Sequence, residues 1–268
     1  MIDCHTHTRY SHDSHQDPRE AVEHAISLGI DYLAFTDHCD RDCLFSPLHK
    51  DKIRQIDLDA CMKEIRSLKE EYKNKIEIAA GIECGFMAPA SHVYVEDLKK
   101  HPTDIIINSI HLVNLTDCYF KEFFEGKDKK EAYDMYTQAI YDSLFAPYHY
   151  DVVAHIGYVS RKAPYEDKFY RYSDMSDKLD AILKTIVEKG KALEINSHAE
   201  GTGDITLPNL DILKRYKELG GELITFGSDA HKIEKQGFMY NEVCERLSSI
   251  GFKYLFKYLE HKPIAVKF

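Results

Sequence analysis

The stretch Met1-Ile2-Asp3-Cys4-His5-Thr6-His7 begins with a short apolar segment that runs directly into two histidines. We interpret residues 1–4 as a β-strand. Alternate side chains of an extended chain project to the same side, so His5 and His7 should point in one direction. Two imidazoles held in this way commonly chelate one metal ion. The segment therefore predicts a strand with a pair of metal ligands at its carboxyl end.

The same pattern recurs along the rest of the chain. Short apolar segments at 32–35, 76–82, 104–109, 151–154, 192–195 and 222–226 alternate with helical stretches, as in βα units around a parallel sheet. Each segment ends in, or is followed by, a potential metal ligand, in the order Asp37 and His38, Glu83, His111, His155, Glu194 and Asn196, Asp229 and His231. The carboxyl ends of barrel strands open on one face, so these side chains should meet in one cup.

Helix signals support this alternation. Asp17 is placed to cap a first helix, Pro18 suits its first position, Glu20 suits the reciprocal capping position, and Gly29 ends it. Further helices are expected over residues 58–72, 129–145, 176–188, 210–219 and 241–249, whereas residues 116–130 form a polar, irregular insertion. No internal repeat or long linker interrupts the pattern. We predict an α/β fold with a single domain over residues 1–268.

Composition limits the partners of the protein. Its formal net charge is -10, so it lacks the basic field that gives proteins affinity for nucleic acids or membrane surfaces, and neither partner is expected. No apolar run approaches the roughly 18–20 residues that span a bilayer. The seven cysteines are scattered, without a CxxC pair, and no leader-like segment opens the chain. Reduced thiols and a cytoplasmic location are therefore expected, and the oligomeric state is left open.

The histidines divide into two groups. Six of the 15 lie in predicted helices or polar loops and are interpreted as surface or hydrogen-bonded residues: His24, His49, His92, His101, His149 and His261. The His, Asp and Glu residues at the strand ends recur in one order and are interpreted as a single site. Such nitrogen and oxygen donors suit zinc, manganese and iron. A carboxylate such as Glu83 can also bridge two ions.

At these residues the chain resembles the PHP (polymerase and histidinol phosphatase) superfamily, and in particular its histidinol-phosphatase branch. The resemblance covers essentially the full length. It is carried by Asp3-Cys4-His5-Thr6-His7-Thr8, Phe35-Thr36-Asp37-His38, Gly81-Ile82-Glu83, Ser109-Ile110-His111, Ala154-His155-Ile156, Leu193-Glu194-Ile195-Asn196 and Gly227-Ser228-Asp229-Ala230-His231. Each motif is weak alone, but seven in this order are specific. The resemblance implies a distorted (β/α)7 TIM-like barrel, the PHP fold.

The resemblance also implies a site for three divalent metal ions (Zn, Mn or Fe) with nine ligands. The first ion would be held by His5, His7, Glu83 and Asp229. Glu83 would bridge to a second ion, which is also held by His111 and His155. A third ion would be held by Asp13, His38 and His231. The family often has His at the Asp13 position. The offset from the first histidine pair selects Asp13, with His12 as a close alternative and His15 as a distant one.

The implied activity is hydrolysis of a small phosphate monoester by a hydroxide that bridges the metals. The expected catalytic residues are Glu83, Asp229 and His231. L-histidinol phosphate, an intermediate of histidine synthesis, is the leading candidate substrate. Arg161 matches a position with which relatives hold phosphate.

One departure from the family concerns the substrate. Relatives that act on histidinol phosphate tend to carry an Arg in the loop after the Asn196 position, whereas residues 197–203 contain none. His198 is the candidate replacement in that loop. Two alternatives remain: a phosphoesterase for another small phosphate or nucleotide, and a non-catalytic PHP domain that serves as a binding module.

Overall fold

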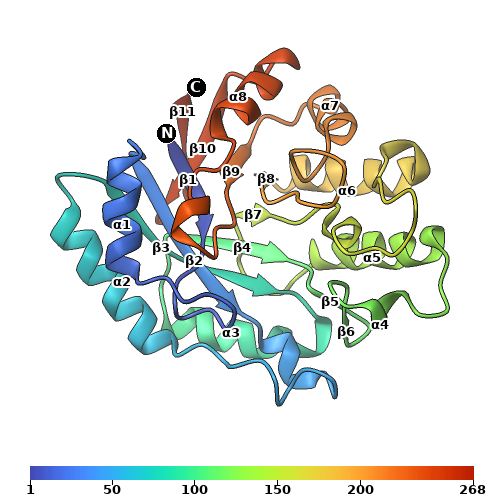
Figure 1. The fold of residues 1–268 in the computed structure, drawn as a ribbon, viewed down its shortest axis with the longest axis horizontal. Helices are drawn as coiled ribbons and strands as arrows, with labels where there is room; N and C mark the ends of the chain where they lie inside the picture. The colour runs from blue at the N-terminus through green and yellow to red at the C-terminus, as the bar shows by residue number, and fades with distance from the viewer.

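A computed structural model describes all residues, 1–268, and has a parallel sheet that curls into a nearly closed barrel (Figure 1). The sheet has seven strands, which pair in chain order: β1 (Ile2–Thr6), β2 (Tyr32–Cys39), β3 (Glu77–Gly85), β4 (Ile105–Ser109), β7 (Val152–Val153), β8 (Ala192–Asn196) and β9 (Ile224–Gly227). Nearly every residue of these strands is buried, as expected when helices cover a parallel sheet. The predicted α/β class and distorted (β/α)7 barrel are confirmed.

The barrel closes between its first and last strands. The backbone N–H of Asp229 donates to the carbonyl of His5 at 2.8 Å, and the N–H of His7 donates to the carbonyl of Ala230 at 3.0 Å. Thr6 and Ala230 form a parallel bridge. Closure therefore brings the first and the last of the ligand motifs side by side, although they lie at opposite ends of the sequence.

Seven helices follow the barrel strands: α1 (Pro18–Ser27), α2 (Leu58–Tyr72), α3 (Ser91–Lys100), α5 (Lys129–Ser143), α6 (Ser176–Glu188), α7 (Leu210–Glu218) and α8 (Tyr240–Ser249). The Asp17 side chain caps α1 by accepting from the N–H groups of Arg19 and Glu20, as predicted. The sequence pattern does not predict α3, because that helix buries only Ser91 and Tyr94 and so has no long apolar stripe. None of the helices combines the length and hydropathy needed to cross a membrane.

Smaller elements surround the two ends of the barrel. The insertion after β4 contains β5 (Leu112–Val113), β6 (Thr116–Asp117) and the short helix α4 (Lys121–Phe124). Short 3-10 turns occupy Arg41–Phe45, Ala88–Ala90, Tyr158–Ser160, Tyr172–Asp174 and Ile233–Lys235. Most apolar side chains join one continuous core, in keeping with the single domain proposed for residues 1–268.

The chain ends in an antiparallel hairpin of β10 (Tyr254–Leu259) and β11 (Lys262–Lys267). This hairpin contacts the amino-terminal ends of the barrel strands. The Tyr32 hydroxyl at the start of β2 donates to the carbonyl of Tyr258 at 2.8 Å. The N–H of His261 donates to the carbonyl of Asp104, just before β4, at 2.9 Å. The hairpin thus covers the end of the barrel opposite to the strand ends that carry the predicted ligands.

Gly81 in β3 allows close approach of the neighbouring strand. A Cβ atom at this position would lie 2.5 Å from Ile105 Cγ2 and 2.7 Å from the Ile105 carbonyl oxygen. Gly81→Ala should therefore force β3 and β4 apart and lower the free energy of unfolding by about 1–3 kcal/mol. Urea denaturation measures this loss, with Glu70→Ala on the exposed face of α2 as a control that changes little. An unchanged midpoint for Gly81→Ala would contradict the crowding.

Candidate metal centre

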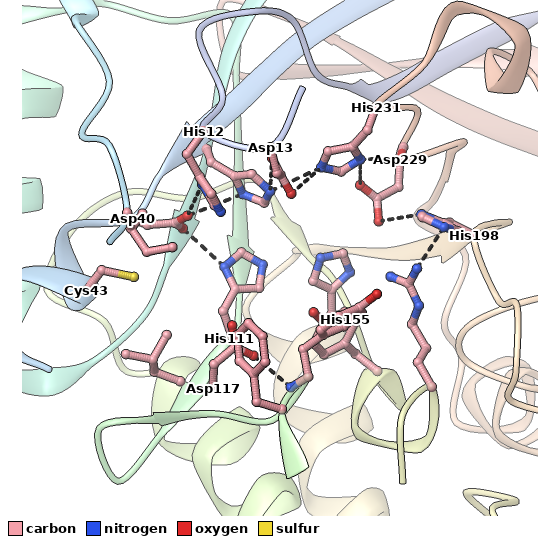
Figure 2. A pocket seen from close by; sticks show the side chains of 17 residues that line it. His12, Asp13, Asp40, Cys43, His111, Asp117, His155, His198, Asp229 and His231 are labelled. Carbon is pink, nitrogen blue, oxygen red and sulfur yellow. Dashed lines mark hydrogen bonds and ion pairs between the residues drawn. The ribbon is translucent and has the colours of Figure 1, made fainter. Parts of the chain in front are cut away.

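The nine predicted metal ligands lie together at the carboxyl ends of the barrel strands. Six of them line a cavity of about 380 Å³ together with Asp40, Asp117, Arg161 and His198: Asp13, His38, His111, His155, Asp229 and His231 (Figure 2). The other three, His5, His7 and Glu83, are buried and contact these residues. Several groups of three side chains each offer donor atoms within 4.8 Å of one another, among them His5–Glu83–His155, His5–His7–Asp229, His38–Glu83–His111 and His7–His38–His231. The β/α topology therefore assembles, from segments far apart in sequence, donors able to hold metal ions.

Glu83 lies at the centre of this cluster and its side chain is 0% exposed. One carboxylate oxygen, Oε1, is 2.8 Å from His155 Nε2 and 3.3 Å from His111 Nε2. The other, Oε2, is 2.8 Å from His38 Nδ1 and 3.4 Å from His5 Nε2. Burial raises the pKa of Glu83, but the four imidazoles outweigh burial and hold that pKa well below its usual range. The carboxylate is therefore ionised and faces ligands on two sides, as a bridging group would.

His5 and His7 converge on Asp229, as the spacing of the first motif predicts. His7 Nε2 is 3.0 Å from Asp229 Oδ1, and His5 Nε2 is 3.7 Å from the same oxygen. The two Nε2 atoms are only 3.1 Å apart. At most one proton can lie between two ring nitrogens at this distance. At least one of the two nitrogens therefore directs a lone pair into the space between the rings.

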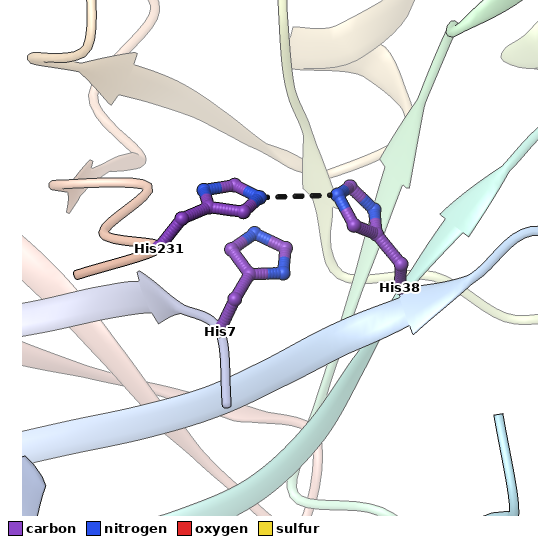
Figure 3. Close-up of side chains that lie close together, drawn as sticks. All are labelled: His7, His38 and His231. Atoms are coloured by element: carbon purple, nitrogen blue, oxygen red, sulfur yellow. Dashed lines mark hydrogen bonds between the residues drawn. The ribbon is translucent and has the colours of Figure 1, made fainter. Parts of the chain in front are cut away.

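A third group combines His7, His38 and His231 (Figure 3). Nε2 of His231 lies 3.3 Å from Nε2 of His38. Asp13 closes this group, since its carboxylate oxygens are 3.1 Å from His231 Nε2 and 3.7 Å from His38 Nε2. His12 instead directs its Nδ1 toward the Asp40 carboxylate at 3.6 Å. The geometry thus favours Asp13 over His12 as the predicted third-metal ligand.

The donor set fits a group of bound cations. Glu83 Oε2 and His38 Nδ1 are buried and lie close together, yet neither has a hydrogen-bond partner. Buried polar atoms normally find a partner, because losing water without replacement costs free energy. Divalent cations between these carboxylates and imidazoles would satisfy the free lone pairs and offset the concentrated negative charge. The nitrogen and oxygen donors suit zinc, manganese or iron.

Glu194 orients two of the imidazoles from behind. The sequence pattern placed Glu194 among the strand-end ligands, but its Oε1 contacts His5 Nδ1 at 2.5 Å and its Oε2 is 3.5 Å from His155 Nδ1. Both contacts use the ring nitrogen that faces away from the metal ligand cluster. Burial raises the pKa of Glu194, but the two histidines outweigh burial and lower that pKa to about 2. An ionised Glu194 therefore fixes the tautomer and orientation of both rings.

Two further carboxylates support the same ligands: Asp40, which the sequence pattern did not single out, and Asp37, which it placed among the potential strand-end ligands. Asp40 Oδ1 lies 3.1 Å from His111 Nδ1. Asp37 accepts hydrogen bonds from the backbone N–H groups of Thr8 at 2.6 Å and Ser11 at 3.1 Å, so it shapes the loop that leads to Asp13. Asp37 and His38 are neighbours on one strand, so their side chains point to opposite faces. This alternation is the only sequence signal that separates the supporting role of Asp37 from the ligand role predicted for His38.

The predicted phosphate-binding pair borders the cluster. Arg161 Nη2 lies 2.7 Å from His198 Nε2, and His198 Nδ1 lies 3.7 Å from Asp229 Oδ2 (Figure 2). The Arg161 guanidinium also packs over the Tyr158 ring, at 5.3 Å from its centre. Arg161 and His198 are thus held at the cavity wall next to the metal ligands, although they come from different loops.

Residues 3–198 match the model of the PHP domain family. The chain is 31% identical to the histidinol-phosphatase of Lactococcus lactis subsp. lactis, over 94% of this chain and 91% of that protein. It is 28% identical to the histidinol-phosphatase of Bacillus subtilis, over 91% of this chain and 98% of that protein.

A solved structure extends this similarity to three dimensions. The crystal structure of the Lactococcus lactis histidinol phosphate phosphatase, complexed with zinc, L-histidinol and phosphate, has a TM-score of 0.88 and 29% identity, and covers 98% of both chains. The chain therefore belongs to the PHP domain family. Within that family it belongs to the histidinol-phosphatase branch, which confirms the resemblance seen in the motifs.

Glu194→Gln should weaken metal binding without unfolding the barrel. The amide cannot carry the charge that holds both imidazoles in one tautomer, and loss of such an orienting contact typically costs about 10–100-fold in metal affinity. Competition with a chromophoric chelator measures the affinity of the purified variant for zinc, and circular dichroism reports its fold. Glu222→Gln, an exposed change before β9, is the control. Equal zinc affinity in Glu194→Gln and the parent would remove this orienting role.

Proposed function

We propose that the protein is a metal-dependent phosphatase that hydrolyses L-histidinol phosphate to L-histidinol and phosphate. The observation that carries this proposal is the convergence of nine His, Asp and Glu side chains beside a cavity with a single arginine, in a chain of the histidinol-phosphatase branch. The cavity of about 380 Å³ lies in the size range of small-molecule binding sites, as a substrate such as L-histidinol phosphate requires.

The metal sites we propose follow the three groups of ligands. His5, His7, Glu83 and Asp229 would hold one ion, Glu83 with His111 and His155 a second, and Asp13, His38 and His231 a third. Zinc is the first candidate, because the Lactococcus lactis enzyme was crystallised with zinc, and manganese and iron suit the same donors. Bound divalent ions would neutralise phosphate charge and lower the pKa of water toward neutrality.

Arg161 and His198 would bind the phosphate group. The guanidinium donates N–H groups in a plane that matches two phosphate oxygens. Its stacking on Tyr158 and its contact with His198 hold it in one orientation before substrate arrives. His198 would replace the arginine that is absent from residues 197–203.

Asp229 and His231 belong to the ligand cluster and would also lie next to the bound phosphate. Asp229 Oδ1 faces His7 and its Oδ2 faces His198. His231 is the more open of the two and lines the cavity together with Arg161. We therefore assign Glu83, Asp229 and His231 as catalytic residues that fix the position of phosphorus relative to the ions.

The part of the cavity wall formed by Asp117, Tyr119 and Phe120 suits the amino alcohol. Asp117 contributes a carboxylate there, beside the rings of Tyr119 and Phe120. Burial raises the pKa of Asp117, and a bound cation would favour its ionised form. We propose that Asp117 accepts hydrogen bonds from the ammonium group of L-histidinol phosphate and that the aromatic rings pack against its imidazole.

Glu83→Gln should lower turnover of L-histidinol phosphate by orders of magnitude while the fold is kept. The neutral amide cannot bridge two cations, and it leaves the four surrounding imidazoles without their common counter-charge. Phosphate release in the presence of Zn²⁺ or Mn²⁺ measures the loss, and thermal denaturation checks folding. Glu96→Gln on the exposed side of α3 serves as control. Near-normal turnover in Glu83→Gln would exclude a bridging role.

Asp117→Asn tests recognition of the amino alcohol. Loss of a charged hydrogen bond, worth about 1.5–3 kcal/mol, should lower kcat/KM for L-histidinol phosphate about 10–100-fold. The same variant should hydrolyse p-nitrophenyl phosphate, which has no ammonium group, within about twofold of the parent rate. If both substrates lose activity equally, Asp117 supports the site as a whole and does not select the substrate.

The missing arginine in residues 197–203 favours one alternative, a phosphatase for another small phosphate or a nucleotide. A panel of phosphate monoesters, assayed with Zn²⁺ or Mn²⁺, decides between the two. A higher kcat/KM for another ester would identify that ester as the better substrate and would leave the proposed reaction, hydrolysis of a phosphate monoester, unchanged. A non-catalytic binding module is disfavoured by the full set of nine donors in one cluster.

A further inference from the structure

His149, Asp151 and His261 converge at the end of the barrel opposite to the candidate metal centre. Asp151 directly precedes β7, and His261 lies in the turn between β10 and β11. His149 Nε2 is 2.8 Å from Asp151 Oδ1, and His261 Nδ1 is 2.9 Å from Asp151 Oδ2. The two rings meet edge to face with 4.7 Å between their centres. Both histidines, which were interpreted from the sequence as surface or hydrogen-bonded residues, thus share one carboxylate.

The backbone fixes two of these three side chains. Asp151 is 2% exposed, and its Oδ2 also accepts from the N–H of Ile106 at 2.8 Å. The N–H of Ala192 donates to the carbonyl of Asp151 at 2.9 Å, so the residue is held between β4 and β8. The hydrogen bond between the His261 N–H and Asp104 fixes the hairpin turn. The carboxylate and one imidazole are therefore held in place independently of each other.

We propose that these three residues form a further binding site for a divalent metal ion of the zinc type. Their donor atoms lie within 4.8 Å of one another. Zinc bonds of about 2.0–2.1 Å in tetrahedral geometry place ligand atoms roughly 3.3 Å apart, so the present nitrogen–oxygen distances need to widen by only a few tenths of an ångström. An ion would replace the two protons that the imidazoles now direct at the carboxylate.

The surroundings set the character of this site. The side chain of His149 is 51% exposed and that of His261 is 32% exposed, so water can complete the coordination. Lys191, whose Nζ donates to the carbonyl of Tyr150 at 2.6 Å, is a nearby positive charge. The site has two neutral imidazoles and one carboxylate as ligands, and the lysine ammonium nearby repels a cation. It should therefore bind zinc more weakly than the carboxylate-rich cluster in the barrel. The ion would join the C-terminal hairpin to β7 and would act on stability, not on turnover.

Equilibrium dialysis of the holoenzyme against Zn²⁺, followed by elemental analysis, tests this site. The parent chain should bind one zinc more than His149→Gln and one more than His261→Gln. His92→Gln is the matched control, because His92 is exposed on α3 and its ring contacts the Pro89 carbonyl at 3.0 Å. This control should bind as much zinc as the parent. Added zinc should also raise Tm by about 3–6 °C more in the parent than in either site variant.

Two readouts separate this site from the catalytic one. Turnover of L-histidinol phosphate should be unchanged in His149→Gln and His261→Gln, because the substitutions lie at the opposite end of the barrel. His149 is half exposed, so its variant should fold normally, and circular dichroism checks this. If either variant binds the same number of zinc ions as the parent, the three side chains are joined only by hydrogen bonds and the site does not exist.

Discussion

The buried carboxylate of Glu83, surrounded by the rings of four histidines, is the constraint on which the rest of the site depends. An ionised group without exposure to water is very costly unless positive charge or hydrogen bonds compensate it. Neutral imidazoles offer lone pairs as well as protons, and several of these nitrogens face each other. Such an arrangement is stable when cations occupy the space between the donors. The fold therefore concentrates carboxylate charge that is balanced either by protonated imidazoles or by bound cations.

Outer carboxylates make this concentration of ligands possible. Glu194 and Asp40 each engage the ring nitrogen of a histidine that faces away from the cluster. Asp37 shapes the loop before Asp13, and Asp3 accepts from the N–H of Ser228 at 2.9 Å next to Asp229. These contacts set ring orientation and tautomer before any ion binds. Folding itself therefore orders these ligands, and metal binding does not have to supply the free energy for that ordering.

The sequence predicted the barrel and the composition of the cluster well, because parallel strands form continuous apolar runs and ligands follow their carboxyl ends. It did not predict α3, whose buried face is too small to produce a periodic pattern. The orienting position of Glu194 depends on which way a side chain turns at a strand end, and residue order alone does not determine that. The contact of His261 with Asp151 joins residues 110 positions apart. No local pattern contains information on such a pair.

Barrel closure between β1 and β9 has a consequence for biosynthesis. His7 and Asp229 lie 222 residues apart, and translation at about 5–20 residues per second separates their synthesis by roughly 10–40 s. During that time the nascent chain presents its first histidine pair without the carboxylate that completes it. The site of the first ion, which includes Asp229, is therefore complete only after the last barrel strand has left the ribosome. Uptake of metal at that position marks the end of folding, whereas Glu83, His111 and His155 are all synthesised earlier.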